Sequence, residues 1–213
     1  MDTASFLPAL SDAFDDFPHD ETPRQRIFAD ILARVGGLAK PNNLALLATA
    51  TSLLDRGESY VEAGSYKGAS LIAASYGKDG DFVGIDDFSM GEGSREELTS
   101  NLESFGCRHV TILEGDIFDV LRSGTLASHR IGVYYYDAAH GYEQQLEGLR
   151  LAEPYLANEA LVIVDDTDWE RVDRAVDDYI ESQPRAAPLL RIEGKTHGAP
   201  HWWEGMRVLR WQT

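Results

Sequence analysis

The stretch YVEAGSYKGAS at residues 60–70 decides the fold, because it joins an apolar strand to a helix through two closely spaced glycines. The strand runs through Val61, and the pattern of SLIAASYG after the second glycine predicts a helix. Glycine permits positive φ and lets the backbone approach a ligand, while the first N–H groups of a helix favour an anionic group such as a carboxylate or phosphate. The turn therefore predicts a site for a nucleotide-like ligand.

The spacing of these glycines disfavours a bound pyrophosphate. Tyr66 stands where the GxGxxG pattern of dinucleotide-binding proteins has its middle glycine. Gly64 and Gly68 could also be turn glycines with no ligand beside them. The stretch alone does not decide between these two interpretations.

Composition predicts a single globular unit without affinity for nucleic acid. The chain has 213 residues, 43% of them hydrophobic, and a net charge of -17, which repels phosphates and anionic membranes. The start lacks the basic segment of a secretion signal, and no apolar run reaches the ~20 residues of a membrane span, so we expect a cytoplasmic protein. The single cysteine, Cys107, excludes an internal disulfide and a cysteine metal cluster.

Strands and helices alternate from residue 58 onward. Apolar strands such as FVGID, IGVYYYD and ALVIVDD are separated by amphipathic helices, which predicts a mostly parallel sheet covered by helices on both faces. The last two strands, PLLRIE and MRVLRW, have no helical pattern between them and predict an antiparallel pair. Residues 1–57 read as a helical cap or dimer surface, and residues 58–213 as the main domain.

Acidic residues end five of the predicted strands, at the edge where open α/β sheets bind their ligands. They are Glu62, Asp86, Asp116, Asp137, and the pair Asp165 and Asp166. Gathered carboxylates repel each other unless cations or hydroxyl donors lie between them. A carboxylate at Asp86 suits the two hydroxyls of a ribose, and the last three acids suit Mg²⁺. For the neighbouring Asp87, Asp119 and Asp168, a helix cap or a solvated loop is the simpler interpretation.

Three motifs resemble those of class I S-adenosylmethionine-dependent O-methyltransferases of the metal-dependent group, which includes catechol, caffeoyl-coenzyme A and macrolide-sugar enzymes. The segment EAGSYKGAS resembles ELGAYCGYS of the catechol enzyme, DAAHGYE resembles the plant segment DADK, and VDDTDW is similar to the plant YDNTLW. The resemblance implies a Rossmann-like methyltransferase fold, with a seven-stranded sheet whose last strand is antiparallel. It covers roughly residues 60–180.

The resemblance also implies which residues bind the cofactor S-adenosylmethionine. The methionine end would lie at Gly64, Ser65, Tyr66, Gly68 and Ser70, with Glu62 supporting the turn and the amino group, Asp86 at the ribose, and Asp116 at the adenine. Asp116 could equally cap the next helix. The residues Ile117 and Phe118 after it are possible packing neighbours of the adenine.

By the same resemblance, Asp137, Asp165 and Asp166 would bind Mg²⁺ or a similar divalent cation. His140 stands where the catechol and plant enzymes have lysine, and macrolide-sugar enzymes have a histidine there, proposed as the base that deprotonates the acceptor hydroxyl. His140 could instead be an ordinary helix N-terminal residue that packs near Tyr142.

The expected reaction is methyl transfer to a hydroxyl of a small molecule, a sugar or another natural product, with a homodimer possible. Three alternatives stay open: a metal-independent methyltransferase, a nicotinamide-dependent oxidoreductase, and a non-catalytic cofactor-binding protein. The paired Trp202 and Trp203 either line the acceptor site or pack under the N-terminal helices. The run of three tyrosines at residues 134–136 predicts sheet core.

Overall fold

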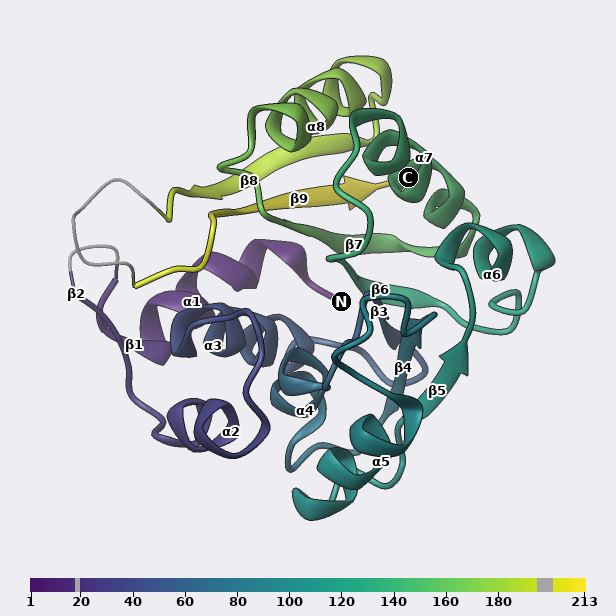
Figure 1. Cartoon of the computed structure of the whole chain (residues 1–213). Coiled ribbons are helices and arrows are strands. Elements are labelled where there is room, and N and C mark those ends of the chain that lie inside the picture. Colours follow the sequence, from purple (N-terminus) through teal and green to yellow (C-terminus); the bar gives the residue numbers. More distant parts are fainter. Residues whose placement is uncertain (18–19, 195–200) are drawn as a thin grey trace.

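A computed structural model describes residues 1–17, 20–194 and 201–213, with an α/β sandwich as its architecture (Figure 1). Its central sheet has seven strands: β3 (Ser59–Ala63), β4 (Asp81–Asp86), β5 (Thr111–Glu114), β6 (Ile131–Tyr136), β7 (Leu156–Asp165), β8 (Ala186–Ile192) and β9 (Met206–Gln212). The order across the sheet is β5-β4-β3-β6-β7-β9-β8, with β9 antiparallel to both of its neighbours. The predicted sheet, including the antiparallel last strand, is confirmed.

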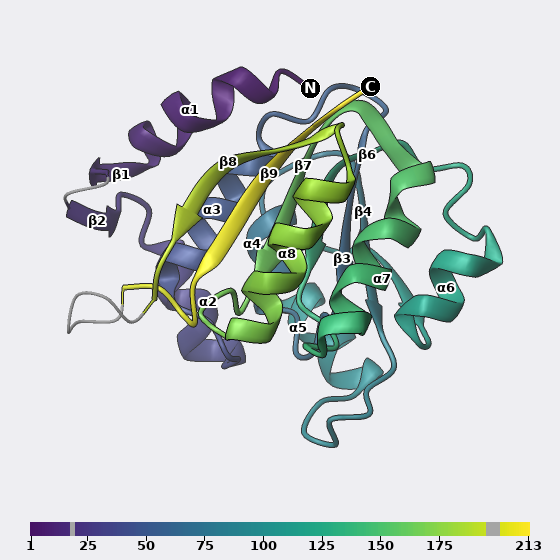
Figure 2. The same cartoon turned by 90° about the horizontal axis from the view of Figure 1, so that it is seen from above.

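Helices cover both faces of this sheet. On one face lie α1 (Phe6–Ala13), α2 (Ile27–Val35), α3 (Pro41–Thr51), α4 (Ala69–Ser75) and α5 (Arg95–Ser104); on the other lie α6 (Ile117–Ser123), α7 (Tyr142–Ala152) and α8 (Glu170–Ser182). Figure 2 shows α1 and α3 on one side of the strands and α6 and α7 on the other. Short 3₁₀ turns at Thr3–Ser5 and Glu153–Tyr155 complete the helical part.

The N-terminal helices belong to the layer that covers one face of the sheet. Side chains of α1, α2 and α3 share a hydrophobic core with Tyr60, Val133 and Leu161 of the central strands. The segment between α1 and α2 also forms a small antiparallel pair, β1 (Phe14–Asp16) with β2 (Asp20–Pro23), which the helical interpretation of residues 1–57 missed. The boundary at residue 57 stays a prediction.

Side-chain alternation along β6 divides the three tyrosines between the two faces. Tyr134 and Tyr136 lie in the core with α7, whereas Tyr135 lies in the core with the N-terminal helices. All three are buried, as the apolar strand pattern predicts. The strand order changes direction between β3 and β6, and ligands of open α/β sheets bind outside the carboxyl ends of the strands at such a point.

Gly148 in α7 permits close packing of this helix on β6. A Cβ atom at Gly148 would lie 2.0 Å from Cε2 of the buried Tyr136 ring. We expect Gly148→Ala to lower the free energy of unfolding by about 1–3 kcal/mol through overpacking, as measured by urea denaturation. The exposed Arg150→Ala on the same helix is the matched control and should change stability by less than about 0.5 kcal/mol. Equal stability of both variants would contradict tight packing at this contact.

Candidate active site

The turn between β3 and α4 rests directly on the end of β6. The N–H of Asp137 donates to the carbonyl of Ala63 at 2.8 Å, and Gly64 has φ +89°. A Cβ at Gly64 would lie 1.9 Å from the Asp137 carbonyl oxygen, and one at Gly68, φ +91°, would lie 2.3 Å from Leu98 Cδ1. Both glycines are therefore required by close contacts and by positive φ, so they are more than generic loop residues.

A buried carboxyl group supports this turn from below. Glu62 is fully buried and accepts hydrogen bonds from the hydroxyl of Ser70 at 2.9 Å and from that of Tyr60 at 2.5 Å. Burial is the main cause that raises the pKa of Glu62 to about 8. Its carboxyl group thus ties the first turn of α4 to the sheet, consistent with a supporting role.

A cavity of about 660 Å³ lies at the carboxyl edge of the sheet, within the size range of small-molecule sites. Most of the predicted site residues line it: Gly64, Ser65, Tyr66, Gly68, Ser70, Asp86, Asp116, Asp137, His140 and Asp166. Glu62 and Asp165 are not among the lining residues. The structure therefore brings the glycine turn and the histidine together in one chamber.

Two of the lining acids also organise the surrounding loops. Asp86 accepts from the N–H of Tyr66 through Oδ2 and from that of Phe88 through Oδ1, both at 2.7 Å. Asp116 caps α6, accepting from the N–H of Phe118 at 2.9 Å and of Asp119 at 3.1 Å. Asp116 therefore caps a helix and also lines the cavity, while its contact with the adenine stays a prediction.

Asp137, His140 and Asp166 form a cluster whose ligand atoms all lie within 4.8 Å of one another. Nε2 of His140 is 2.8 Å from Oδ2 of Asp166 and 3.6 Å from Oδ1 of Asp137. Asp166 adopts φ +55°, which is uncommon for a residue with a side chain and often marks a functional site. Its other carboxylate oxygen, Oδ1, is buried without a hydrogen-bond partner among the described residues.

Asp165 is not a member of this cluster, and its place in the predicted ligand set of Asp137, Asp165 and Asp166 stays a prediction. It is 2% exposed, accepts from the hydroxyl of Tyr135, and accepts through Oδ1 from the N–H of Asp166 at 2.9 Å. Strand alternation and register place Asp165 on the same face of the sheet as Tyr135 and Asp137, where the Tyr135 hydroxyl donates to its carboxyl group.

Tyr135 connects the two neighbouring strand ends. Its hydroxyl contacts Oδ2 of Asp137 at 3.2 Å as well as the carboxyl group of Asp165. The prediction of sheet core describes its burial but misses this polar role. The signal was present in the sequence, because Tyr135 precedes Asp137 by two residues and so shares its face of the strand.

The cluster perturbs the titration of its members. Burial of the imidazole lowers the pKa of His140, but its contacts with Asp137 and Asp166 outweigh this and raise the pKa to about 9. Burial is also the main cause that raises the pKa of Asp137 to about 6, and it raises that of Asp165 well above its usual range. His140 is therefore a charged partner of two carboxylates in the protein alone.

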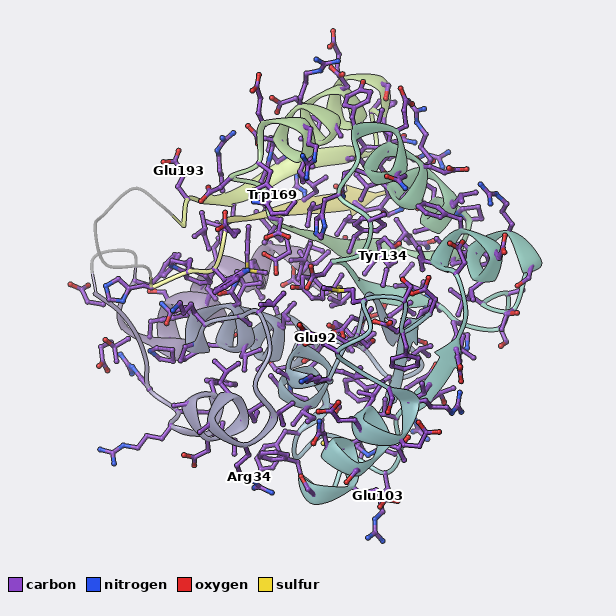
Figure 3. The ribbon with its side chains drawn as sticks, in the orientation of Figure 1. Arg34, Glu92, Glu103, Tyr134, Trp169 and Glu193 are labelled. Atoms are coloured by element: carbon purple, nitrogen blue, oxygen red, sulfur yellow. The ribbon has the colours of Figure 1, made fainter. Side chains whose placement is uncertain are left out.

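Aromatic side chains form the wall of the cavity beside this cluster. Trp169 lies with its ring centroid 5.1 Å from that of His140, and Trp203 and Asn43 also line the chamber. Figure 3 shows Trp169 inside the outline of the molecule, whereas Arg34, Glu103 and Glu193 project from it. Trp169 and Asn43 were not among the residues predicted for this site.

The two interpretations of the paired tryptophans each apply to one of them. Trp202 is buried and packs against Phe14 of the N-terminal segment, with ring centroids 5.8 Å apart, while Trp203 faces the cavity. The remainder of this loop, residues 195–200, lies outside the described residues.

Comparison with known proteins identifies the family. The family described as "Methyltransferase domain" matches residues 61–167, half of the chain. The chain belongs to this methyltransferase family. The expected class I methyltransferase is thus confirmed, and the alternative of a nicotinamide-dependent oxidoreductase is set aside. A search of curated proteins gave no match.

Solved structures share the fold of this methyltransferase. An O-methyltransferase from Bacillus cereus, in complex with SAH, has 14% identity and a TM-score of 0.66, covering 99% of this chain and 98% of its own. TomG of Streptomyces achromogenes, involved in tomaymycin synthesis and solved with SAM, has 18% identity, 81% and 80% coverage and a TM-score of 0.62. CalS11, a TDP-rhamnose 3'-O-methyltransferase of calicheamicin biosynthesis, has 21% identity, 89% and 82% coverage and a TM-score of 0.56.

The described helices of this methyltransferase include none that is long and apolar enough to cross a membrane.

The raised pKa of Glu62 predicts a pH dependence of stability. Because the folded-state pKa of about 8 exceeds the ordinary value of 4.5, the protonated carboxyl stabilises the fold fully below pH 4.5, and this contribution is lost as the pH rises to about 8. Glu62→Gln keeps the hydrogen-bond partners and cannot ionise, so its melting temperature should fall less than that of the wild type between pH 5 and pH 9. Parallel pH profiles for the two proteins would contradict a protonated Glu62.

Proposed function

We propose that this methyltransferase transfers the methyl group of S-adenosylmethionine to a hydroxyl of a small molecule, with the help of a divalent cation. The observation that carries the proposal is the position of the cluster formed by Asp137, His140 and Asp166, which lines the same cavity as the glycine turn. The fold is shared with solved proteins that hold SAM or SAH, which supports the choice of methyl donor.

The donor set of the cluster fits a cation such as Mg²⁺ or Mn²⁺. Asp137 and Asp166 supply hard carboxylate oxygens, and Oδ1 of Asp166 is buried without a hydrogen-bond partner among the described residues. Asp165 would support these ligands through Tyr135 and through the N–H of Asp166. When bound, the cation would lower the pKa of an acceptor hydroxyl and fix its direction.

Different residues of the cavity would bind the methyl donor and the acceptor. The turn at residues 64–68 and the acids Asp86 and Asp116 would hold the donor, while the wall of Trp169 and Trp203 would shape the acceptor side. Holding both reactants in line is the main requirement for displacement at a sulfonium methyl group. The apolar wall also keeps water from the reacting atoms.

His140 would accept the proton of the acceptor hydroxyl. In the protein alone, its pKa of about 9 keeps the imidazole charged. If Asp137 and Asp166 also held a cation, less of their negative charge would act on His140, its pKa would fall, and the neutral imidazole would be available as a base near neutral pH.

A metal-independent methyltransferase is the second candidate. The ion pair between His140 and Asp166, at 2.8 Å, favours it, because a histidine oriented by a carboxylate can act as a base without a cation. The two candidates predict opposite responses to a chelator.

The test is methyl transfer from S-adenosylmethionine to a panel of catechols, sugars and other natural-product hydroxyls, followed by mass spectrometry. We expect EDTA to abolish turnover, Mg²⁺ or Mn²⁺ to restore it, and SAH affinity to stay within about twofold throughout. Full turnover in excess chelator would support the metal-independent candidate. SAH binding with no methylated product across the panel would support a non-catalytic protein.

A second prediction concerns the base. His140→Ala should lower kcat by about 100-fold or more, the usual contribution of general base catalysis, with SAH affinity unchanged. The exposed His109→Ala, at the opposite end of the sheet, is the matched control and should leave kcat unchanged. Wild-type turnover of the His140 variant would remove this residue from the mechanism.

A further inference from the structure

Residues 203–205 form a bridging segment that joins the acceptor wall of the cavity to the turn that carries Asp166. On one side, the buried side chain of Asn43 in α3 binds both backbone groups of Trp203. The N–H of Trp203 donates to Oδ1 of Asn43 at 3.0 Å, and Nδ2 of Asn43 donates to the Trp203 carbonyl at 3.3 Å. The segment is therefore anchored to the N-terminal layer.

On its other side, the bridging segment binds the turn after β7. The N–H of Asp168 donates to the carbonyl of Glu204 at 2.8 Å, and the indole Nε1 of Trp169 donates to Oε2 of Glu204 at 3.1 Å. A Cβ at Gly205, φ +75°, would lie 2.5 Å from Oδ1 of Asp168, so the carboxyl group of Asp168 packs directly against the backbone of Gly205. Asp168 is thus a loop residue, as expected, and its backbone and side chain contact residues 204 and 205.

This turn sets the geometry of the reactive cluster. Asp166 has φ +55°, and an unusual backbone conformation of this kind persists only where the surrounding contacts determine it. The N–H of Trp169 closes the turn onto the Asp166 carbonyl at 3.0 Å, and the Trp169 ring also packs beside His140. The hydrogen bond that Trp169 donates to Glu204 therefore affects the positions of His140, the proposed base, and of Asp166, the second carboxylate of the cluster.

We propose that Glu204 and Asn43 are positioning residues, which hold the acceptor wall at Trp203 and the cation ligand Asp166 in one rigid unit through the bridging segment. The inference rests on the proposed function, because it assigns a role within the proposed site. Partners that orient metal ligands without touching the metal typically change affinity or activity by about 10–100-fold when removed. Glu204 acts on Asp166 through the β7–α8 turn, and Asn43 acts on the acceptor wall through the Trp203 backbone.

Substitutions on the two sides of the bridging segment should have different kinetic effects. Loss of the carboxylate in Glu204→Ala should weaken Mn²⁺ binding and lower kcat, each by about tenfold, with SAH affinity unchanged. Glu204→Gln keeps an oxygen acceptor for the Trp169 indole and should restore both values to within about twofold of the wild type. Asn43→Ala should raise the KM for the acceptor several-fold with a smaller change in kcat, because the wall at Trp203 loses its anchor.

The experiment measures Mn²⁺ affinity by electron paramagnetic resonance on the full chain without acceptor, together with SAH affinity, melting temperature and steady-state kinetics. The exposed Glu181→Ala in α8 is the control for removal of one negative charge and should behave as the wild type. Trp169→Phe removes the indole donor but keeps an aromatic ring. It should reproduce the loss of Mn²⁺ affinity even where Glu204→Ala does not fold.

The outcomes separate this inference from the function on which it rests. Wild-type Mn²⁺ affinity and kcat in both Glu204→Ala and Trp169→Phe, with normal Mn²⁺ binding by the parent protein, would overturn the positioning role and leave the proposed function intact. An equal loss in Glu204→Gln would also overturn it, since the hydrogen-bond acceptor would then be irrelevant. A parent protein that binds no Mn²⁺ would contradict the proposed cation site, and this inference with it.

Discussion

The close approach of the β3–α4 turn to the end of β6 is the constraint on which the rest of the site depends. Only glycine fits at position 64, because a Cβ there would overlap the carbonyl of Asp137. This contact places the helix that begins at residue 69 beside the strand that delivers Asp137. The β3–α4 turn and the cluster of Asp137, His140 and Asp166 are therefore positioned by one backbone contact. A side chain at this glycine would displace both.

The second constraint is electrostatic, since several carboxyl groups share a small volume. Each is matched with a donor: Glu62 with the hydroxyls of Tyr60 and Ser70, Asp165 with Tyr135, and Asp166 with His140. Burial raises the pKa of Glu62 and Asp165 and so favours their protonated forms, whereas contacts with Asp137 and Asp166 raise the pKa of His140 to about 9 and favour the imidazolium. A cation at this place would substitute for the charge that His140 supplies in the protein alone.

The fold was predictable because its signals are local. Apolar strands that end in an acid, amphipathic helices between them and a strand pair without a helix at the end of the chain predict the sheet and its antiparallel last strand. The geometry of Asp166 was less predictable, because it depends on the positive φ of this residue and on its contact with His140. The pairing of Asn43 with Trp203 was beyond sequence reasoning, since 160 residues separate them. The short β1–β2 pair was missed because its acidic residues disfavour strands.

The proposed reaction requires a divalent cation bound by Asp137 and Asp166 next to the donor. Anomalous scattering from a crystal grown with Mn²⁺ and SAH tests it most directly. We expect a single strong peak within coordination distance of carboxylate oxygens from both residues, with Nε2 of His140 no longer paired to Oδ2 of Asp166. Absence of a peak there, with the 2.8 Å ion pair between His140 and Asp166 intact and SAH in place, would contradict it.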